Sequence, residues 1–235
     1  MKGNPDFAMP EQLEYPLPYT SRSLSPRELK KQDVYSYLSP KEGRLVRVVG
    51  LSLIVALRLE FSPEVSSYIE RPRRLSCNGQ IHELSFWYRE RNGRERCVMV
   101  VPHTSSSVDA TGRREHRHAQ TLLEAAEHAS VPLHFESEAQ LLEERSHSQA
   151  RLRMLPMVQT AQRLNNRLPL RQRIVEFSSQ LERFRLSQLV KALGGYAPAD
   201  VRAVACDLIH IGRLQVDVSA PLSDGSLLWR RVLPR

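Results

Sequence analysis

The segment spanning residues 58–103 constrains the fold more than any other part of the chain. It contains three short apolar runs rich in β-branched and aromatic residues, a composition typical of strands: Val65–Ile69, Ile81–Tyr88 and Cys97–Val101. Turns that contain Asn-Gly separate these runs, at residues 77–79 and 91–93. Asn-Gly favours a tight hairpin because both central turn positions adopt positive φ. The segment is therefore predicted to form an antiparallel meander.

Helix and strand patterns continue on both sides of this meander. Leu45–Glu60 is apolar and long enough for a short strand followed by a core helix. After the meander, the pattern predicts a serine-rich loop, a helix, a strand and a second helix, over residues 104–111, 113–129, 131–136 and 137–145. Ser137, with Gln140 three residues later, is expected to form a capping box. The predicted class is α/β, a mixed sheet with flanking helices.

The last third of the chain has a different pattern, three helices followed by a hairpin. The helices are expected over residues 169–184, 186–193 and 198–212, and the strands at Leu214–Val218 and Leu227–Val232. This is the order of a winged helix, a fold whose third helix usually enters the major groove of DNA. Its outer face would carry Asp200, Arg202, Ala203, Cys206 and His210. Winged helices also mediate protein contacts, and this face has few side chains that read bases.

These patterns divide the chain into four parts. Residues 1–40 contain six prolines and interleaved tyrosines and cations, and are expected to form an extended arm. Residues 41–147 form the α/β domain, and residues 169–235 the winged-helix domain. Residues 148–168, interrupted by Pro156, are expected to connect them.

Positive charge is concentrated beside this connection. The chain has a net charge of +8, and residues 145–185 contain nine arginines against two glutamates, a local charge of +7. Single-sign patches attract polyanions, and arginine suits bidentate contact with phosphate. The alternative is a solvated helix face. The residues expected to bind DNA are Arg145, Arg151, Arg153, Arg163, Arg167, Arg171, Arg173, Arg202, His210, Arg230 and Arg231.

Four short motifs in the first half of the chain stand in a distinctive order. They are Leu59-Glu60-Phe61-Ser62-Pro63-Glu64-Val65, Tyr68-Ile69-Glu70-Arg71-Pro72, Ser85-Phe86-Trp87 and Val98-Met99-Val100-Val101-Pro102. Together they resemble the TnsA-like endonuclease subunit of heteromeric transposases. The resemblance covers about residues 40–235 and implies a restriction-endonuclease-like domain followed by a winged-helix domain. It also implies a Glu on the first helix, an Asp before the aromatic strand and a Glu/Gln-x-Lys on the next strand.

The catalytic residues that this resemblance implies are mostly missing. In such a site two carboxylates hold divalent cations and the lysine orients the attacking water. Residues 45–59 contain no acid, Ser85 stands at the Asp position, and Val100 and Pro102 stand at the Glu-x-Lys positions. The possible substitutes are Glu83, which would share a strand face with Ser85, together with Glu60 or Glu70 and His103. The resemblance therefore favours a nuclease scaffold that has lost its metal site.

A second cluster of possible ligands is Arg114-Glu115-His116-Arg117-His118. Two histidines two positions apart on a helix point about 200° apart, so they are not expected to share a metal ion. No metal site is predicted here. The three cysteines, Cys77, Cys97 and Cys206, are scattered and fit reduced, mostly buried thiols.

The sequence also bears on location. No apolar run reaches the ~20 residues that span a bilayer, and the first residues lack the apolar centre of a signal peptide. A cytoplasmic, nucleoid-associated protein without membrane contact is expected.

The sequence thus predicts an accessory subunit of DNA transposition, TnsA-like and without catalysis, that needs no cofactor. The resemblance implies double-stranded DNA, an integrase-type transposase subunit and an AAA+ ATPase transposition regulator as partners. One alternative is an active, Mg-dependent DNA endonuclease that cuts transposon ends with a displaced site. Another is a regulator in which only the winged helix binds DNA.

Overall fold

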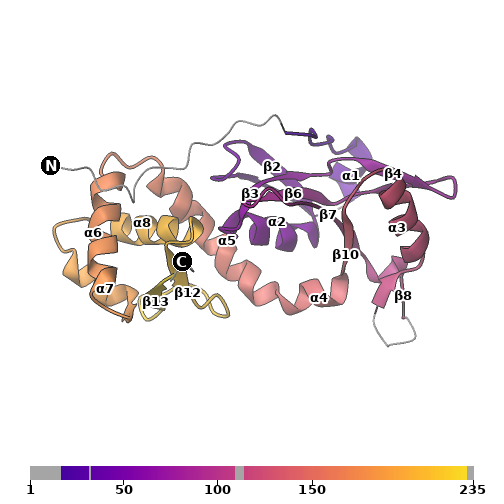
Figure 1. The fold of residues 1–235 in the computed structure, drawn as a ribbon. Helices are drawn as coiled ribbons and strands as arrows, with labels where there is room; N and C mark the ends of the chain where they lie inside the picture. The colour runs from indigo at the N-terminus through magenta and orange to yellow at the C-terminus, as the bar shows by residue number, and fades with distance from the viewer. Residues whose placement is uncertain (1–16, 32, 109–113, 232–235) are drawn as a thin grey trace.

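The computed structural model describes residues 17–31, 33–108 and 114–231. The N-terminal half forms one end of an elongated molecule and the C-terminal half the other (Figure 1). Helix α5 (Arg145–Ala161) runs between them.

A mixed sheet of four strands organises the N-terminal half. Its strands, in spatial order, are β10 (Leu133–Ser137), β7 (Glu95–Val101), β6 (Phe86–Glu90) and β3 (Val65–Glu70). β10 is parallel to β7, and the other neighbours are antiparallel. This arrangement confirms a mixed α/β class.

Two helices cover opposite faces of this sheet. Side chains alternate along a strand, so Val98 of β7 packs in the cluster that includes α2 (Ser52–Phe61). Cys97 and Met99 pack on the other face, in the cluster that includes α3 (Ala119–His128). The sheet therefore lies between two apolar layers.

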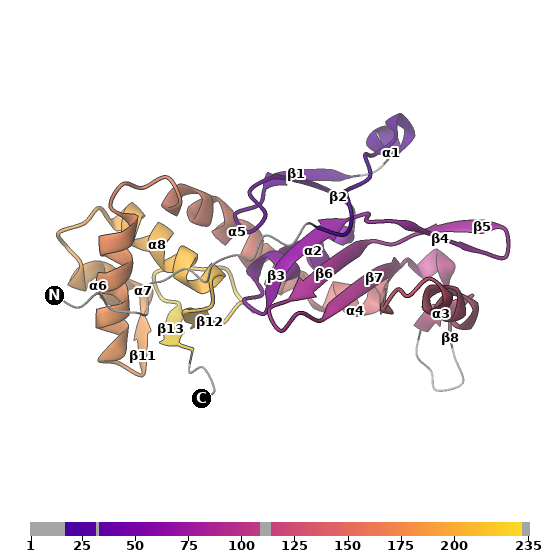
Figure 2. The ribbon, with the colours of Figure 1, turned by 45° about the horizontal axis from the view of Figure 1, so that its top comes forward.

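The Asn-Gly turns lie where the sequence predicts them. Asn78 and Gly79 have positive φ, 50° and 71°, and Gly93 has a φ of 85°. The run predicted as one strand over 81–88 is two strands, because β5 (Gln80–Glu83) pairs with β4 (Arg74–Cys77) in a separate hairpin. The β4–β5 hairpin projects beyond the central sheet (Figure 2).

The predicted extended arm is shorter than expected. Residues 26–31 form the short helix α1 (Pro26–Lys31), and β1 (Val34–Leu38) pairs with β2 (Leu45–Val49). β1 pairs with β2 and buries Tyr37, whose hydroxyl is 2.9 Å from that of Tyr68. Part of the predicted arm, residues 1–16, lies outside the described residues.

The segment after β7 also differs in part. A 3₁₀ turn (His103–Ser105) precedes the hairpin of β8 (Ser106–Val108) and β9 (Arg114–His116), where a loop and a helix start were expected. The next helix, α4 (Glu138–Glu143), begins with the predicted capping box between Ser137 and Gln140.

The C-terminal third follows the predicted order of helices and strands. Its helices are α6 (Arg167–Ser179), α7 (Leu186–Ala192) and α8 (Pro198–His210), and its strands are β11 (Arg183–Arg185), β12 (Leu214–Val216) and β13 (Leu227–Arg230). The strands form one sheet in the order β11-β13-β12. The unexpected strand is β11, which precedes α7.

The predicted connecting segment is largely a core helix. α5 continues through Pro156, whose position on the exposed side leaves the missing hydrogen bond open to solvent. Its buried residues Met154, Leu155 and Val158 belong to one apolar cluster that also contains residues of α2 and α8. The two halves therefore share a core.

Gly212 lies at a close contact between the two halves. It has a φ of +75°, and a Cβ added there would lie 2.4 Å from Cβ of Pro63. We predict that Gly212→Ala lowers the free energy of unfolding by more than about 2 kcal/mol, from positive-φ strain and the clash together. Urea denaturation measures this loss.

Gly79→Ala is the matched control, because Gly79 has a φ of +71° and open space around it. Gly79→Ala should lower the free energy of unfolding only by the backbone strain, about 1 kcal/mol. Equal losses for the two variants would contradict a tight junction at Gly212.

Candidate functional site

The positions that the resemblance assigns to metal ligands lie side by side on β6 and β7. The backbone N–H of Val100 donates to Oγ of Ser85 at 2.9 Å, and the backbone N–H of Ser85 donates to the carbonyl of Val98 at 2.8 Å. Pro102 and His103 follow β7 and are exposed. Ser85 and Val100 are therefore in contact, and the three positions carry a hydroxyl, an isopropyl group and a pyrrolidine ring in place of metal ligands.

An ion-pair cluster lies next to Val100 and includes Glu136 of the neighbouring strand β10. Glu136 of β10 is the register partner of Val100, and it pairs with Arg58 of α2. Arg58 also donates to Glu144 at 2.9 Å, and His134 lies 3.3 Å from Glu136. Burial raises the pKa of Glu136, but the hydrogen bonds from His134 and Arg58 outweigh it and leave the pKa below its ordinary value. On α2, where the resemblance implies an acid, the residue that contributes to this cluster is the cation Arg58.

The sequence analysis did not find this cluster. Arg58 lies in an apolar helix whose other charge is Glu60, and Glu136 lies within a strand that has no distinctive pattern. Only the parallel pairing of β10 with β7 brings Glu136 beside Val100.

The first proposed substitute, Glu83, is occupied by the N-terminal segment. It lies on the β4–β5 hairpin rather than on the central sheet, so the expected shared face with Ser85 is not formed. Arg22 binds both oxygens of Glu83 and also Glu28 at 2.9 Å. A hydrogen bond from Arg22 is the main reason that the pKa of Glu28 is lowered to about 2.

The other two carboxylates named as substitutes, Glu70 and Glu60, also have cations or hydroxyls as partners. Glu70 is buried and lies 2.8 Å from Arg44 and 3.8 Å from Arg71. Glu60 is fully buried and accepts hydrogen bonds from several groups described below. Among the described residues, no three His, Cys, Asp or Glu side chains are arranged to hold a metal ion.

Glu60 joins the two halves of the molecule. Its carboxylate is 2.8 Å from Nε2 of His210 at the end of α8, and it accepts from the Tyr68 hydroxyl at 2.6 Å. The Ser39 hydroxyl and the backbone N–H of Lys41 also donate to it. Burial raises the pKa of Glu60, but the hydrogen bond and charge of His210 and the two hydroxyls outweigh it and keep the pKa below its usual value.

This interaction corrects the predicted role of His210. The residue is buried and does not lie on an outer face of α8. Ala203 and Cys206 are buried as well, because α5 packs over the side of α8 that was expected to be open. Arg202 forms two hydrogen bonds of 2.9 Å with Asp224. The third helix is therefore a core helix, and it does not present the predicted reading face.

Some of the predicted DNA-binding arginines also have structural partners. Buried Asp207 accepts from Arg171 at 2.6 Å and from Arg167 at 2.9 Å. Arg171 is itself buried, so its predicted role in DNA binding is wrong. Arg231 pairs with Glu64 across the junction of the two halves. Exposed members of the predicted set remain: Arg145, Arg153, Arg163, Arg173 and Arg230.

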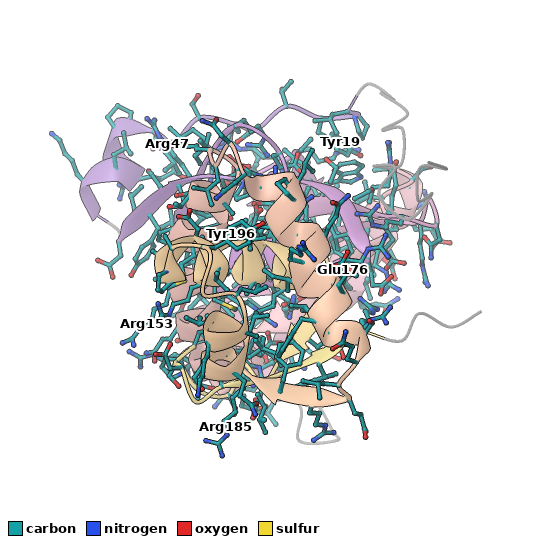
Figure 3. All side chains as sticks on the ribbon, turned by 90° about the vertical axis from the view of Figure 1, so that its left-hand side faces the viewer. Tyr19, Arg47, Arg153, Glu176, Arg185 and Tyr196 are labelled. Atoms are coloured by element: carbon teal, nitrogen blue, oxygen red, sulfur yellow. The ribbon has the colours of Figure 1, made fainter. Side chains whose placement is uncertain are left out.

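A cationic and aromatic face on the C-terminal sheet adds to this set. Arg183, Arg185, Gln215 and Trp229 lie on one face, because the register pairs Arg183 and Gln215 with Trp229 and side chains alternate. The guanidinium of Arg183 lies 5.6 Å from the centre of the Trp229 ring. Figure 3 shows Arg185 and Arg153 pointing outward at the C-terminal end of the molecule. In the sequence, Arg183 and Arg185 contribute to the counted charge, but Arg183 falls within the helix predicted over residues 169–184, so no strand was expected here.

The histidine cluster has a geometry that the sequence did not predict. His116 ends β9 and His118 precedes α3, so the expected separation on one helix does not apply. Their ring centres are 5.9 Å apart, and His82 of β5 lies 5.4 Å from His116. Burial lowers the pKa of both His82 and His116.

The three cysteines are free thiols and all buried, as predicted.

Comparison with known proteins adds no assignment: no protein-family model matches the chain, and no curated protein matches it significantly. Within the described parts of the chain, none of the helices has the length and apolar character needed to cross a membrane.

The Glu60 interaction predicts a large and specific effect on stability. Replacing Glu60 by Ala leaves His210 and the buried hydroxyls without their acceptor, and should lower the free energy of unfolding by about 3–5 kcal/mol. Glu64→Ala removes an exposed ion pair across the same junction and should cost about 1 kcal/mol or less. Urea denaturation of both variants measures the difference, and similar losses would contradict a central role for Glu60.

The same carboxylate predicts a dependence on pH. Because the pKa of Glu60 is lowered in the folded state from 4.5, its stabilisation is present above pH 4.5 and is lost as the pH falls through the folded value. Glu60→Gln cannot titrate, so its stability should fall less than that of the wild type between neutral pH and pH values below 4.5. Parallel urea curves at several pH values test this, and identical acid limbs would be the contrary result.

Proposed function

We propose that this chain is a TnsA-like subunit of a DNA transposition system that binds DNA without cutting it. The observation that carries the proposal is that Glu83, Glu70 and Glu136, the acids that could replace the missing metal ligands, each have an arginine partner. A divalent cation would have to displace a guanidinium from Glu83, Glu70 or Glu136, and each displacement costs an ion pair.

The order of elements supports a restriction-endonuclease-like domain for the first half. A helix, three antiparallel strands, a second helix and a parallel strand follow one another as α2, β3, β6, β7, α3 and β10. The β4–β5 hairpin is an insertion between the first two strands. The order α6, β11, α7, α8, β12 and β13 similarly supports a winged helix for the second half.

DNA binding would use the sheet rather than the third helix. Because α8 is covered by α5, the arginines left for phosphate contact lie on α5, on α6 and on the face of β11 and β13. Arginines on an exposed face suit contact with the phosphates of a DNA duplex. Binding of this kind is weakly selective for sequence and strongly weakened by salt.

The partners in this proposal are double-stranded DNA, an integrase-type transposase subunit and an AAA+ ATPase regulator. They are proposed from the resemblance of the motifs at residues 59–102. The site of action would be the nucleoid.

Salt-dependent binding of a labelled DNA duplex tests the proposed surface. Arg183→Ala with Arg185→Ala should weaken binding by about tenfold or more and reduce the slope of log K against log salt by about 2, because each phosphate contact contributes about 0.9. The control is Arg114→Ala with Arg117→Ala, two exposed cations at the other end of the molecule. Fluorescence anisotropy gives both quantities, and equal losses in the two double variants would rule out this surface.

A nicking assay on supercoiled plasmid tests the absence of catalysis. With Mg²⁺ or Mn²⁺ we expect no conversion to the open-circle form beyond that of buffer. Cleavage that is lost in Glu83→Ala or Glu136→Ala would instead establish the alternative, an endonuclease with a displaced site.

A further inference from the structure

A cavity of about 290 Å³ lies at the junction of the two halves. It is bounded by the end of α2, by α5, by the end of α8 and by strands β12 and β13. Most of its walls are apolar, including Phe61, Met154, Ile209 and Val216. Its charged lining residues are both arginines, and no acid contributes to it. Arg231 is already paired with Glu64, so the cavity combines an apolar interior with one cation, Arg151, that is left for a ligand.

Arg151 is the more unusual of these two arginines. Its side chain extends from α5 and is mostly buried, and its Nη1 has no hydrogen-bond partner among the described residues. The nearest carboxylate oxygen, on Glu144, is 3.9 Å away. A buried guanidinium nitrogen without an acceptor is unfavourable, because it has lost its hydrogen bonds to water. An anionic group that enters the cavity would remove this cost.

Strand β12 forms another part of the cavity wall. β12 is an edge strand of its sheet, paired only with β13 in the described structure. Leu214, Gln215 and Val216, which form this strand, all line the cavity. An edge strand presents N–H and C=O groups that an extended peptide can pair with. A small organic acid would not use these groups.

We propose that this cavity binds an extended peptide segment of a partner protein. The peptide backbone pairs along β12, and one apolar side chain fills the space between α2, α5 and α8. A carboxylate two residues away lies on the same side of the extended peptide and pairs with Arg151. The volume is near the lower limit for ligand pockets and suits one or two side chains. This binding does not require the chain to bind DNA.

The two tryptophans make the test direct. The indole N–H of Trp229 donates to Gln215 at 2.6 Å beside the cavity, whereas that of Trp87 donates to Glu95 at 3.0 Å in the N-terminal half. In a ¹H–¹⁵N spectrum of the full chain, the Trp229 signal reports the cavity and the Trp87 signal is an internal reference.

Two peptides serve as probes, acetyl-Ser-Leu-Thr-Asp-Ser-amide and its counterpart with Asn in place of Asp. We expect the first to shift the Trp229 signal saturably and to leave the Trp87 signal unchanged. The Asn peptide should bind about tenfold more weakly, because it lacks the charge-assisted hydrogen bond. Arg151→Gln should remove this difference, and Arg145→Gln, an exposed position on the same helix, should retain it.

Three results would overturn the proposal. The first is no shift at peptide concentrations of about 10 mM, where even weak recognition is detectable. The second is equal binding of the two peptides. The third is binding of 4-methylpentanoate as tightly as the Asp peptide, which would identify a small carboxylic acid as the ligand. If Arg151→Gln unfolds, Val218→Phe, which fills the cavity from its partly exposed edge, should block the Asp peptide.

Discussion

The buried carboxylate of Glu60 is the interaction on which the arrangement of the two halves depends. It is fully buried, and its partners come from the β1–β2 hairpin, from β3 and from the last residue of α8. A charge in this position is tolerated only because donors surround it. The same junction contains the close contact between Gly212 and Pro63 and the shared core along α5. The C-terminal half is thereby held in one position against the sheet.

The acids near the expected metal positions are paired with arginines. A site that gathers a divalent cation needs carboxylates whose negative charge is left uncompensated by the protein. Here Glu83 is paired with Arg22, Glu70 with Arg44, and Glu136 with Arg58. In each pair the guanidinium group stabilises the charge of the carboxylate, as a bound metal ion does in a metal site. Arginines that remain exposed in the C-terminal half, among them Arg173, Arg183 and Arg185, are available to a polyanion.

The sequence predicted the parts of the fold that local patterns determine. The Asn-Gly turns, the capping box at Ser137 and the helices before and after the sheet depend on neighbouring residues, and each lies close to the predicted position. Other features depend on distant pairing. Strand β1 exists because β2 pairs with it, and His210 is buried because α5 and α2 cover it. The pattern of α8 alone could not show this, since Ala203 and Cys206 suit either an exposed or a covered face.

Arginines compensate Glu83, Glu70 and Glu136, and we propose that these acids therefore do not gather divalent cations. Titration of the protein with Mn²⁺, followed by the electron paramagnetic resonance signal of the free ion, tests this most directly. We predict that the signal rises with added Mn²⁺ as it does in buffer at the same ionic strength. Stoichiometric loss of the signal, restored by replacing Glu83, Glu70 or Glu136 with its amide, would contradict the account.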